Sequence, residues 1–104
     1  MIARMWRGYT KPEDADMFEV LLKTELQRDI RDAPGFSHSY LLRRDRTNDV
    51  EFVTVTLWDS LKSIRDFMGP SYEAPAVPEE RRRYLIRYDA TATHYEVPSI
   101  SIAD

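Results

Sequence analysis

The sequence predicts an α+β protein with a ferredoxin-like β-α-β-β-α-β order, in which two helices cover one face of a four-stranded antiparallel sheet. Three observations support this fold class. Apolar residues recur at strand spacing in four segments, and they recur at helical spacing in two others. Glycine, proline and polar turn residues separate these segments. The 104 residues suit one domain, which we expect to span residues 1–97, followed by a C-terminal tail, 98–104.

The first half of the chain predicts a strand followed by a long amphipathic helix. Residues 2–9 are rich in strand formers, and Thr10 with Glu13 has the spacing of a capping box. A helix over about residues 12–31 follows, and Pro34-Gly35 ends it. Its apolar stripe is spaced at three and four residues: Ala15, Phe18, Leu22, Leu26 and Ile30.

The second half predicts a hairpin, a short helix and a last strand. Strands over residues 36–44 and 52–58 flank the turn signal at 46–49. Asp59 or Ser60 is the expected cap of a helix that stops at Gly69-Pro70. Three prolines make the following segment irregular, a brief helical turn is expected over 78–84, and residues 88–97 form the last strand.

Composition argues against several classes of function. The net charge of −3 disfavours nucleic acid, and the basic run 81–83 directly follows Glu79 and Glu80, as on a solvated helix face. The chain has no cysteine, which excludes disulfides and thiol chemistry. No apolar run approaches the roughly 20 residues that span a bilayer, and the N-terminal stretch lacks the apolar core of a signal peptide. We therefore expect a cytoplasmic protein with no membrane contact.

The strand at 52–58 is apolar on both faces, although two helices can cover only one face of the sheet. Burying about 100 Å² of each exposed apolar side chain at ~25 cal/mol per Å² would contribute several kcal/mol. The expected solution is a homodimer in which the two sheets face each other. Its contact would include Val53, Val55 and Leu57.

Several segments together resemble the antibiotic biosynthesis monooxygenase superfamily, especially its small single-domain bacterial members. They are "MIARMWRG" at the start, "PGF" and "LLRR" in the second strand, "EFVTVTLWDSLKSIRDF" through the third strand and second helix, and "HYEV" near the end. The resemblance covers about residues 1–97 and implies a homodimeric α+β barrel with a ligand pocket between helices and sheet in each subunit.

The branches of that superfamily differ in chemistry, and this sequence matches none of them fully. The cofactor-free oxygenases carry an asparagine four residues before the recurrent tryptophan and a tyrosine six residues after it, where this chain has Thr54 and Ile64. The haem-degrading branch needs an axial histidine before the last strand. That stretch has none, and Tyr72 is its only local substitute.

If the pocket lies on the helix side, strand alternation selects its lining. The candidates are Arg4, Trp6, Phe36, His38, Tyr40, Thr54, Thr56 and Trp58, with Tyr72 from the segment that follows the second helix. This mostly aromatic set suits a planar, partly polar ligand. For Trp6 and Trp58, packing in the core is an equally good interpretation. His38 and His94 do not form a metal-binding pattern, so no metal is expected.

The resemblance, together with this lining, implies a cofactor-independent monooxygenase of a small aromatic or quinone-like molecule. In that reading His38 is the base, Arg4 stabilises the substrate anion, and Trp6, Phe36 and Trp58 hold the ring. No bound cofactor is expected. The alternatives are a non-catalytic ligand-binding protein of the same fold and a haem-degrading monooxygenase.

Overall fold

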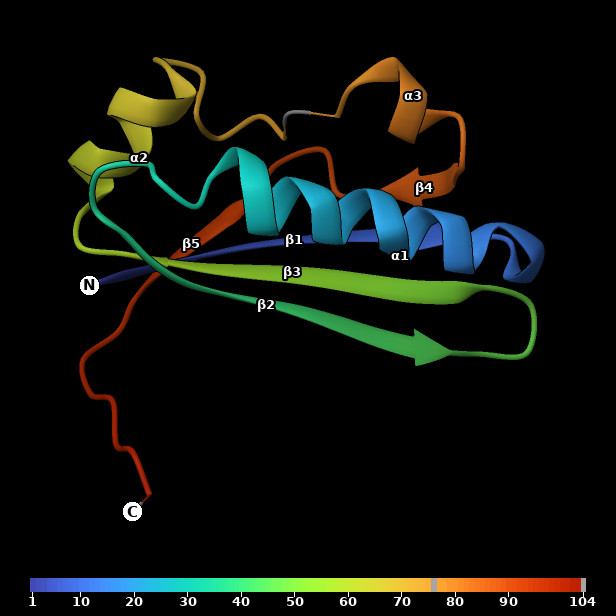
Figure 1. Cartoon of the computed structure of the whole chain (residues 1–104), viewed down its shortest axis with the longest axis horizontal. Helices are drawn as coiled ribbons and strands as arrows, with labels where there is room; N and C mark the ends of the chain where they lie inside the picture. The colour runs from blue at the N-terminus through green and yellow to red at the C-terminus, as the bar shows by residue number, and fades with distance from the viewer. Residues whose placement is uncertain (76, 104) are drawn as a thin grey trace.

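One antiparallel sheet carries all the helices on a single face, and the C-terminal segment runs off beyond the opposite face (Figure 1). The computed structural model describes residues 1–75 and 77–103. The strand order is β2-β3-β1-β4, and β5 also pairs with β1. The predicted α+β, ferredoxin-like class is therefore confirmed. The strands are β1 (Ile2–Thr10), β2 (Phe36–Asp45), β3 (Val50–Trp58), β4 (Leu85–Tyr88) and β5 (Thr93–Glu96).

The long predicted helix is built from three consecutive pieces. A 3₁₀ turn leads into the α-helix, and the last turn widens to a π-helix, in which each bond spans one residue more than in an α-helix. Two short helices, α2 and α3, follow later in the chain. The helical elements are η1 (Pro12–Asp14), α1 (Ala15–Thr24), η2 (Glu25–Asp29), α2 (Leu61–Met68) and α3 (Glu79–Arg82). In the described part of the chain, none is both long and apolar enough to cross a bilayer.

The main core lies between the sheet and α1. The rings of Phe18 and Phe52 meet edge to face at 5.2 Å, and both side chains are fully buried. Trp6, Ala15, Leu22 and Val50 complete the buried cluster. The apolar stripe read from the sequence therefore faces the sheet as expected.

The predicted capping box at Thr10 is wrong. Lys11 precedes the first helical turn, and no side chain caps it. Thr10 instead stays in β1, where it pairs with Val50, and its hydroxyl donates to the carbonyl of Lys11 at 3.0 Å. Strand pairing thus holds the residue in the sheet.

The single last strand predicted over 88–97 is also wrong, because two shorter strands take its place. Both pair with β1, but the chain leaves the ladder between them. There the carbonyl of Asp89 accepts a hydrogen bond from the Trp6 indole at 3.1 Å, and the Ala92 amide donates to the carbonyl of Glu73 at 2.8 Å. These two contacts replace the ladder hydrogen bonds and tie the segment before α3 to the sheet.

The predicted cap of α2 is confirmed at Ser60. Its side-chain oxygen accepts a hydrogen bond from the amide of Ser63 at 3.1 Å. Replacing Ser60 by alanine leaves that amide without its partner. We expect the free energy of unfolding to fall by about 1 kcal/mol. Urea unfolding measures the loss, with Ser101→Ala in the exposed tail as the control. Equal stability of the two variants contradicts the capping role.

Candidate functional site

The two faces of the sheet differ in what covers them. On the helix side, Arg4, Trp6 and Gly8 of β1 lie opposite Thr56, Thr54 and Phe52 of β3. On the other side, which we call the open face, no helix packs (Figure 1). The open face carries Ala3 and Met5 of β1, Val53, Val55 and Leu57 of β3, and Tyr40 and Leu42 of β2.

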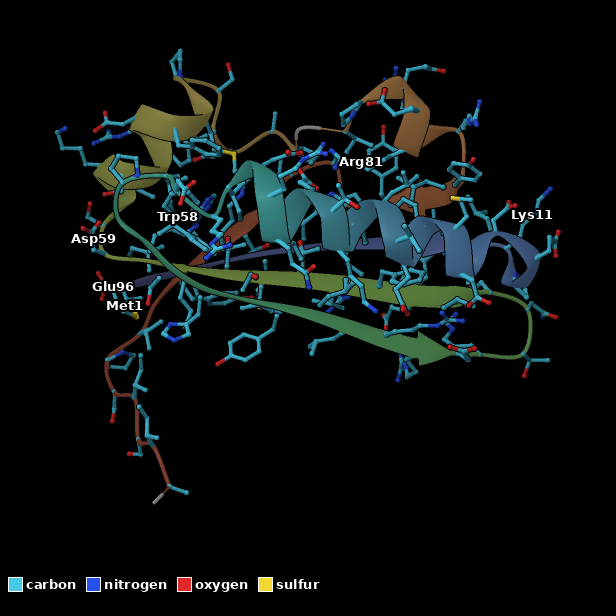
Figure 2. The ribbon with its side chains drawn as sticks, viewed as in Figure 1. Met1, Lys11, Trp58, Asp59, Arg81 and Glu96 are labelled. Carbon is cyan, nitrogen blue, oxygen red and sulfur yellow. The ribbon has the colours of Figure 1, made fainter. Side chains whose placement is uncertain are left out.

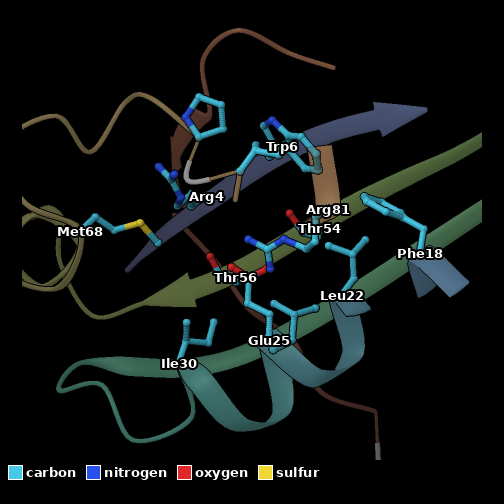
Figure 3. Close-up of a pocket in the computed structure, with 13 residues that line it drawn as sticks. Arg4, Trp6, Phe18, Leu22, Glu25, Ile30, Thr54, Thr56, Met68 and Arg81 are labelled. Carbon is cyan, nitrogen blue, oxygen red and sulfur yellow. The ribbon is translucent and has the colours of Figure 1, made fainter. Parts of the chain in front are cut away.

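A pocket lies between the helix side of the sheet and the helical layer (Figure 3). Its cavity is about 70 Å³, and apolar side chains dominate the lining. Every layer of the fold contributes to it: Arg4, Trp6, Thr54 and Thr56 from the sheet; Phe18, Leu22, Glu25, Leu26, Ile30, Met68 and Arg81 from the helical elements and their ends; Pro75 and Val77 from the segment before α3.

Arg4 is the charged residue of β1 in the pocket, and neutral groups hold its guanidinium. Nη1 donates to the carbonyl of Tyr72 at 2.5 Å and lies 3.0 Å from Nε2 of His94. Nη2 lies 3.5 Å from the carbonyl of Ala74. Burial lowers the pKa of Arg4, while the charge of Glu25 raises it. None of the three groups that hold the Arg4 guanidinium carries a negative charge.

His94 lies behind Arg4 and is held as a neutral acceptor. Burial lowers its pKa, and the adjacent charge of Arg4 lowers it further. Because Arg4 has only donors to offer, Nε2 of His94 accepts and its proton sits on Nδ1. The ring of Tyr72 meets the His94 ring edge to face at 5.3 Å. Together these contacts fix the direction of the Arg4 side chain.

An ion pair between buried Arg81 and half-buried Glu25 forms the opposite side of the pocket. Nη1 of Arg81 lies 2.5 Å from Oε2 of Glu25, and the two side chains point toward each other in Figure 3. Burial raises the pKa of Glu25, which the charge and hydrogen bond of Arg81 partly offset. Glu25 reaches this place from η2, and π-helical turns are frequent at functional sites.

The structure brings together only part of the predicted site. Arg4, Trp6, Thr54 and Thr56 line the pocket as expected from strand alternation. Phe36, Trp58 and Tyr72 are absent from its lining. Trp58 is fully buried between sheet and helices (Figure 2), with its ring 5.5 Å from Phe36.

The predicted facing of His38 and Tyr40 is wrong. A β-bulge lies between Phe36 and His38, so the register shifts by one residue and the following side chains change faces. His38 lies opposite Leu57 and Tyr40 opposite Val55, both on the open face. Within one chain, neither side chain reaches the pocket.

Sequence reasoning missed Glu25 and Arg81. Arg81 was expected on a solvated helix face, yet it is only 9% exposed, while Arg82 and Arg83 are exposed. Glu25 was placed on the polar face of the first helix. Its spacing was the available signal, because position 25 lies seven residues after Phe18 and three after Leu22, on the buried stripe.

The lining does not suit a haem. Haem iron takes a histidine, cysteine or tyrosine as axial ligand, and a methionine only together with a histidine. The described lining contains Met68 but no histidine, cysteine or tyrosine. Among the described residues, no group of three or more histidine, aspartate or glutamate side chains could hold a metal ion.

These features define a ferredoxin-like α+β protein with a small, mostly apolar pocket under its helices. The sequence pattern of the family described as "Antibiotic biosynthesis monooxygenase" matches residues 1–72. The chain belongs to the antibiotic biosynthesis monooxygenase family. No curated protein matches it.

Solved structures of similar fold span nearly the whole chain. A proposed antibiotic biosynthesis monooxygenase of Bacillus cereus is 17% identical with a TM-score of 0.71, over 99% of this chain and 96% of its own. The heme-degrader MhuD of Mycobacterium tuberculosis is 17% identical with a TM-score of 0.64, over 99% and 100%. A mutant of SnoaB, a cofactor-independent oxygenase of Streptomyces nogalater, is 18% identical with a TM-score of 0.62, over 95% of each chain. At these identities the likeness establishes the fold.

Proposed function

We propose that this protein is a cofactor-independent monooxygenase of a small aromatic or quinone-like molecule held between helices and sheet. The observation that carries the proposal is the pocket itself, in which an apolar lining surrounds the charges of Arg4, Glu25 and Arg81. Family membership and the likeness to SnoaB support the reaction class. Cytoplasmic location is part of the same proposal.

Cofactor-free oxygenation needs a substrate that can become an electron-rich anion. A hydroquinone or an anthrone meets this need by losing a proton. The anion then reduces dioxygen: one oxygen atom enters the substrate, the other leaves as water, and the substrate supplies all four electrons. A site for this reaction must stabilise the anion and exclude bulk water.

The pocket-lining residues divide this work among them. The guanidinium of Arg4 stabilises the negative charge, the indole of Trp6 packs against the ring, and the hydroxyl of Thr54 offers one hydrogen bond. The cavity of about 70 Å³ is far below the roughly 300–1,000 Å³ of drug-sized ligand sites. We therefore expect a ligand of one ring, and Met68 and Pro75 to move aside as it enters.

We further propose that two copies assemble through their open faces. Tyr40 and Leu42, which lie opposite Val55 and Val53, are each at least half exposed there. Tyr95, opposite Ala3, is also at least half exposed. Charged residues gather at one end of the face, where Glu51 bridges Arg7 at 3.4 Å and Arg44 at 3.0 Å. An apolar centre with a polar rim fits a symmetric sheet-to-sheet dimer.

Oxygen uptake with a panel of hydroquinones and anthrones tests the reaction. We expect at least one single-ring hydroquinone to consume dioxygen, with one atom of labelled ¹⁸O₂ in the product and the other in water. Leu22→Trp fills the cavity from α1 and is expected to abolish uptake. The control is Val20→Trp on the exposed side of the same helix.

The panel also separates the two classes of function. If some compounds raise the melting temperature and no compound of the panel causes oxygen uptake, the protein is a binding protein, which contradicts the enzyme. A haemin titration with a Soret shift that Leu22→Trp removes identifies the haem-linked alternative. Uptake that survives equally in Leu22→Trp places the reaction outside this pocket.

A further inference from the structure

The ion pair of Glu25 and Arg81 lines the pocket that a ligand would enter. Arg81 is 9% exposed, and its partner Glu25 lies on η2 between Leu22 and Leu26 of the lining. An ion pair that is largely shielded from water contributes little to stability by itself, because the loss of hydration offsets much of the attraction. Stabilising the contact between α3 and the first helix therefore does not explain why both groups lie on the wall of a cavity.

The charges in the pocket wall do not balance. Two guanidinium groups, Arg4 and Arg81, and one carboxylate, Glu25, are the charged residues of the described lining, which leaves one positive charge in excess. The hydrogen-bond partners of Arg4 are two carbonyls and a neutral imidazole nitrogen, so the carboxylate that acts on its charge is Glu25, which also pairs with Arg81. A low-dielectric pocket with one surplus cation favours an anionic ligand.

We propose that the ligand is a single-ring weak acid, a phenol or a hydroquinone, which binds in ionised form between Arg4 and Arg81 after Glu25 has accepted its hydroxyl proton. The O–H bond of the ligand breaks, its electron pair stays on the phenolate oxygen, and the proton goes to a carboxylate oxygen of Glu25. This inference rests on the proposed function, for which it names the acceptor of the first proton and the chemical class of the substrate.

The position of Glu25 suits this role better than that of either histidine. His38 lies on the open face, and Nε2 of His94 is occupied by Arg4. Burial raises the pKa of Glu25; the charges of Arg81 and Arg4 lower it, and the charge of Asp29 raises it. When the ligand anion binds beside Glu25 and pairs with Arg81, the attraction between Arg81 and the Glu25 carboxylate weakens. The pKa of Glu25 then rises further.

4-Nitrophenol tests the proposal, because its phenolate absorbs in the visible and it does not react with dioxygen. Below the solution pKa of the free ligand, we expect the bound ligand to show the phenolate band with no proton released to the buffer. In Glu25→Gln no carboxylate is present to take the proton, so phenolate binding should release about one proton per ligand. Calorimetry in two buffers of different ionisation enthalpy counts that proton.

Glu13→Gln, an exposed exchange of the same kind at the start of the helix, should match the wild type. The neutral isostere 4-nitroanisole is expected to bind at least ten times more weakly than 4-nitrophenol. Equal affinity of the two compounds, a bound ligand without the phenolate band, or no binding of 4-nitrophenol overturns the ligand class. Equal proton release by Glu25→Gln and the wild type overturns the role of Glu25.

The wild type alone provides a second measurement, which does not depend on whether Glu25→Gln folds. Proton transfer to Glu25 predicts that affinity falls at low pH, where Glu25 is already protonated. It also predicts a fall above the ligand's pKa, where binding must take up a proton. A plateau above the ligand's pKa contradicts the transfer. None of these measurements involves oxygen. Proton transfer to Glu25 can therefore be confirmed even if the protein binds the ligand without oxidising it.

Discussion

Replacing Trp58 by alanine is expected to lower the free energy of unfolding by roughly 3–5 kcal/mol, the usual cost of emptying a large aromatic site. The side chain is fully buried and meets the rings of Phe36 at 5.5 Å and Phe67 at 5.8 Å. Its Nε1 also donates to Oγ1 of Thr56 at 2.9 Å. A domain of this size should lose at least roughly 12 °C of melting temperature, at ~4 °C per kcal/mol.

Trp58→Phe separates the packing of Trp58 from a role in the pocket. It keeps most of the apolar volume and loses the donor to Thr56, so we expect a much smaller loss of stability. Because Trp58 does not line the pocket, oxygen uptake and 4-nitrophenol affinity should stay within about twofold of the wild type. A large loss of oxygen uptake or of 4-nitrophenol affinity in a well-folded Trp58→Phe protein would show that Trp58 contributes to the ligand site.

Replacing Val55 by aspartate is expected to dissociate the proposed homodimer. Val55 lies in the middle of the open face, opposite Met5 of β1 and Tyr40 of β2. In a symmetric dimer each substitution occurs twice, and each buried, unpaired carboxylate costs at least 1–3 kcal/mol. Two such costs of about 1.4 kcal/mol raise the dissociation constant about 100-fold.

Analytical ultracentrifugation of wild type and variant over a concentration series measures this change. Val20→Asp is the matched control, because Val20 is 56% exposed on the helical layer and lies away from the open face. We expect it to remain dimeric, and both variants to keep the circular dichroism of the wild type. A wild type that sediments as a monomer, or a Val55→Asp protein that still dimerises equally well, contradicts assembly through this face.

The order of elements was predictable because each long element carries its own local signal. The stripe from Ala15 to Ile30, the alternation in residues 52–58 and the cap at Ser60 all fix their elements without help from distant residues. The split of the last strand was not predictable in this way. It depends on the indole of Trp6 and the carbonyl of Glu73, which are far away in the sequence.

The candidate site was predicted only where strand alternation held from one end to the other. Arg4, Trp6, Thr54 and Thr56 lie on unbroken ladders and were placed correctly. One extra residue at the bulge moves the side chains of His38 and Tyr40 to the other face of the sheet. The alternation of residues along a strand does not reveal such a bulge. Glu25 and Arg81 were missed because burial of a charge depends on its partner, and the two residues come from separate elements.

The position of β1 in the sheet also determines how this chain must fold. β1 pairs with β3 along its whole length, and its other edge pairs with β4 and β5, which are made much later. During synthesis β1 emerges before any of its partners, and the second edge stays unpaired until residues 85–96 have left the ribosome. Contacts of such high sequence separation slow folding and leave strand edges exposed for longer. Nascent chains that end before β4 should therefore stay sensitive to protease, and the native sheet should close only after nearly the whole domain has been translated.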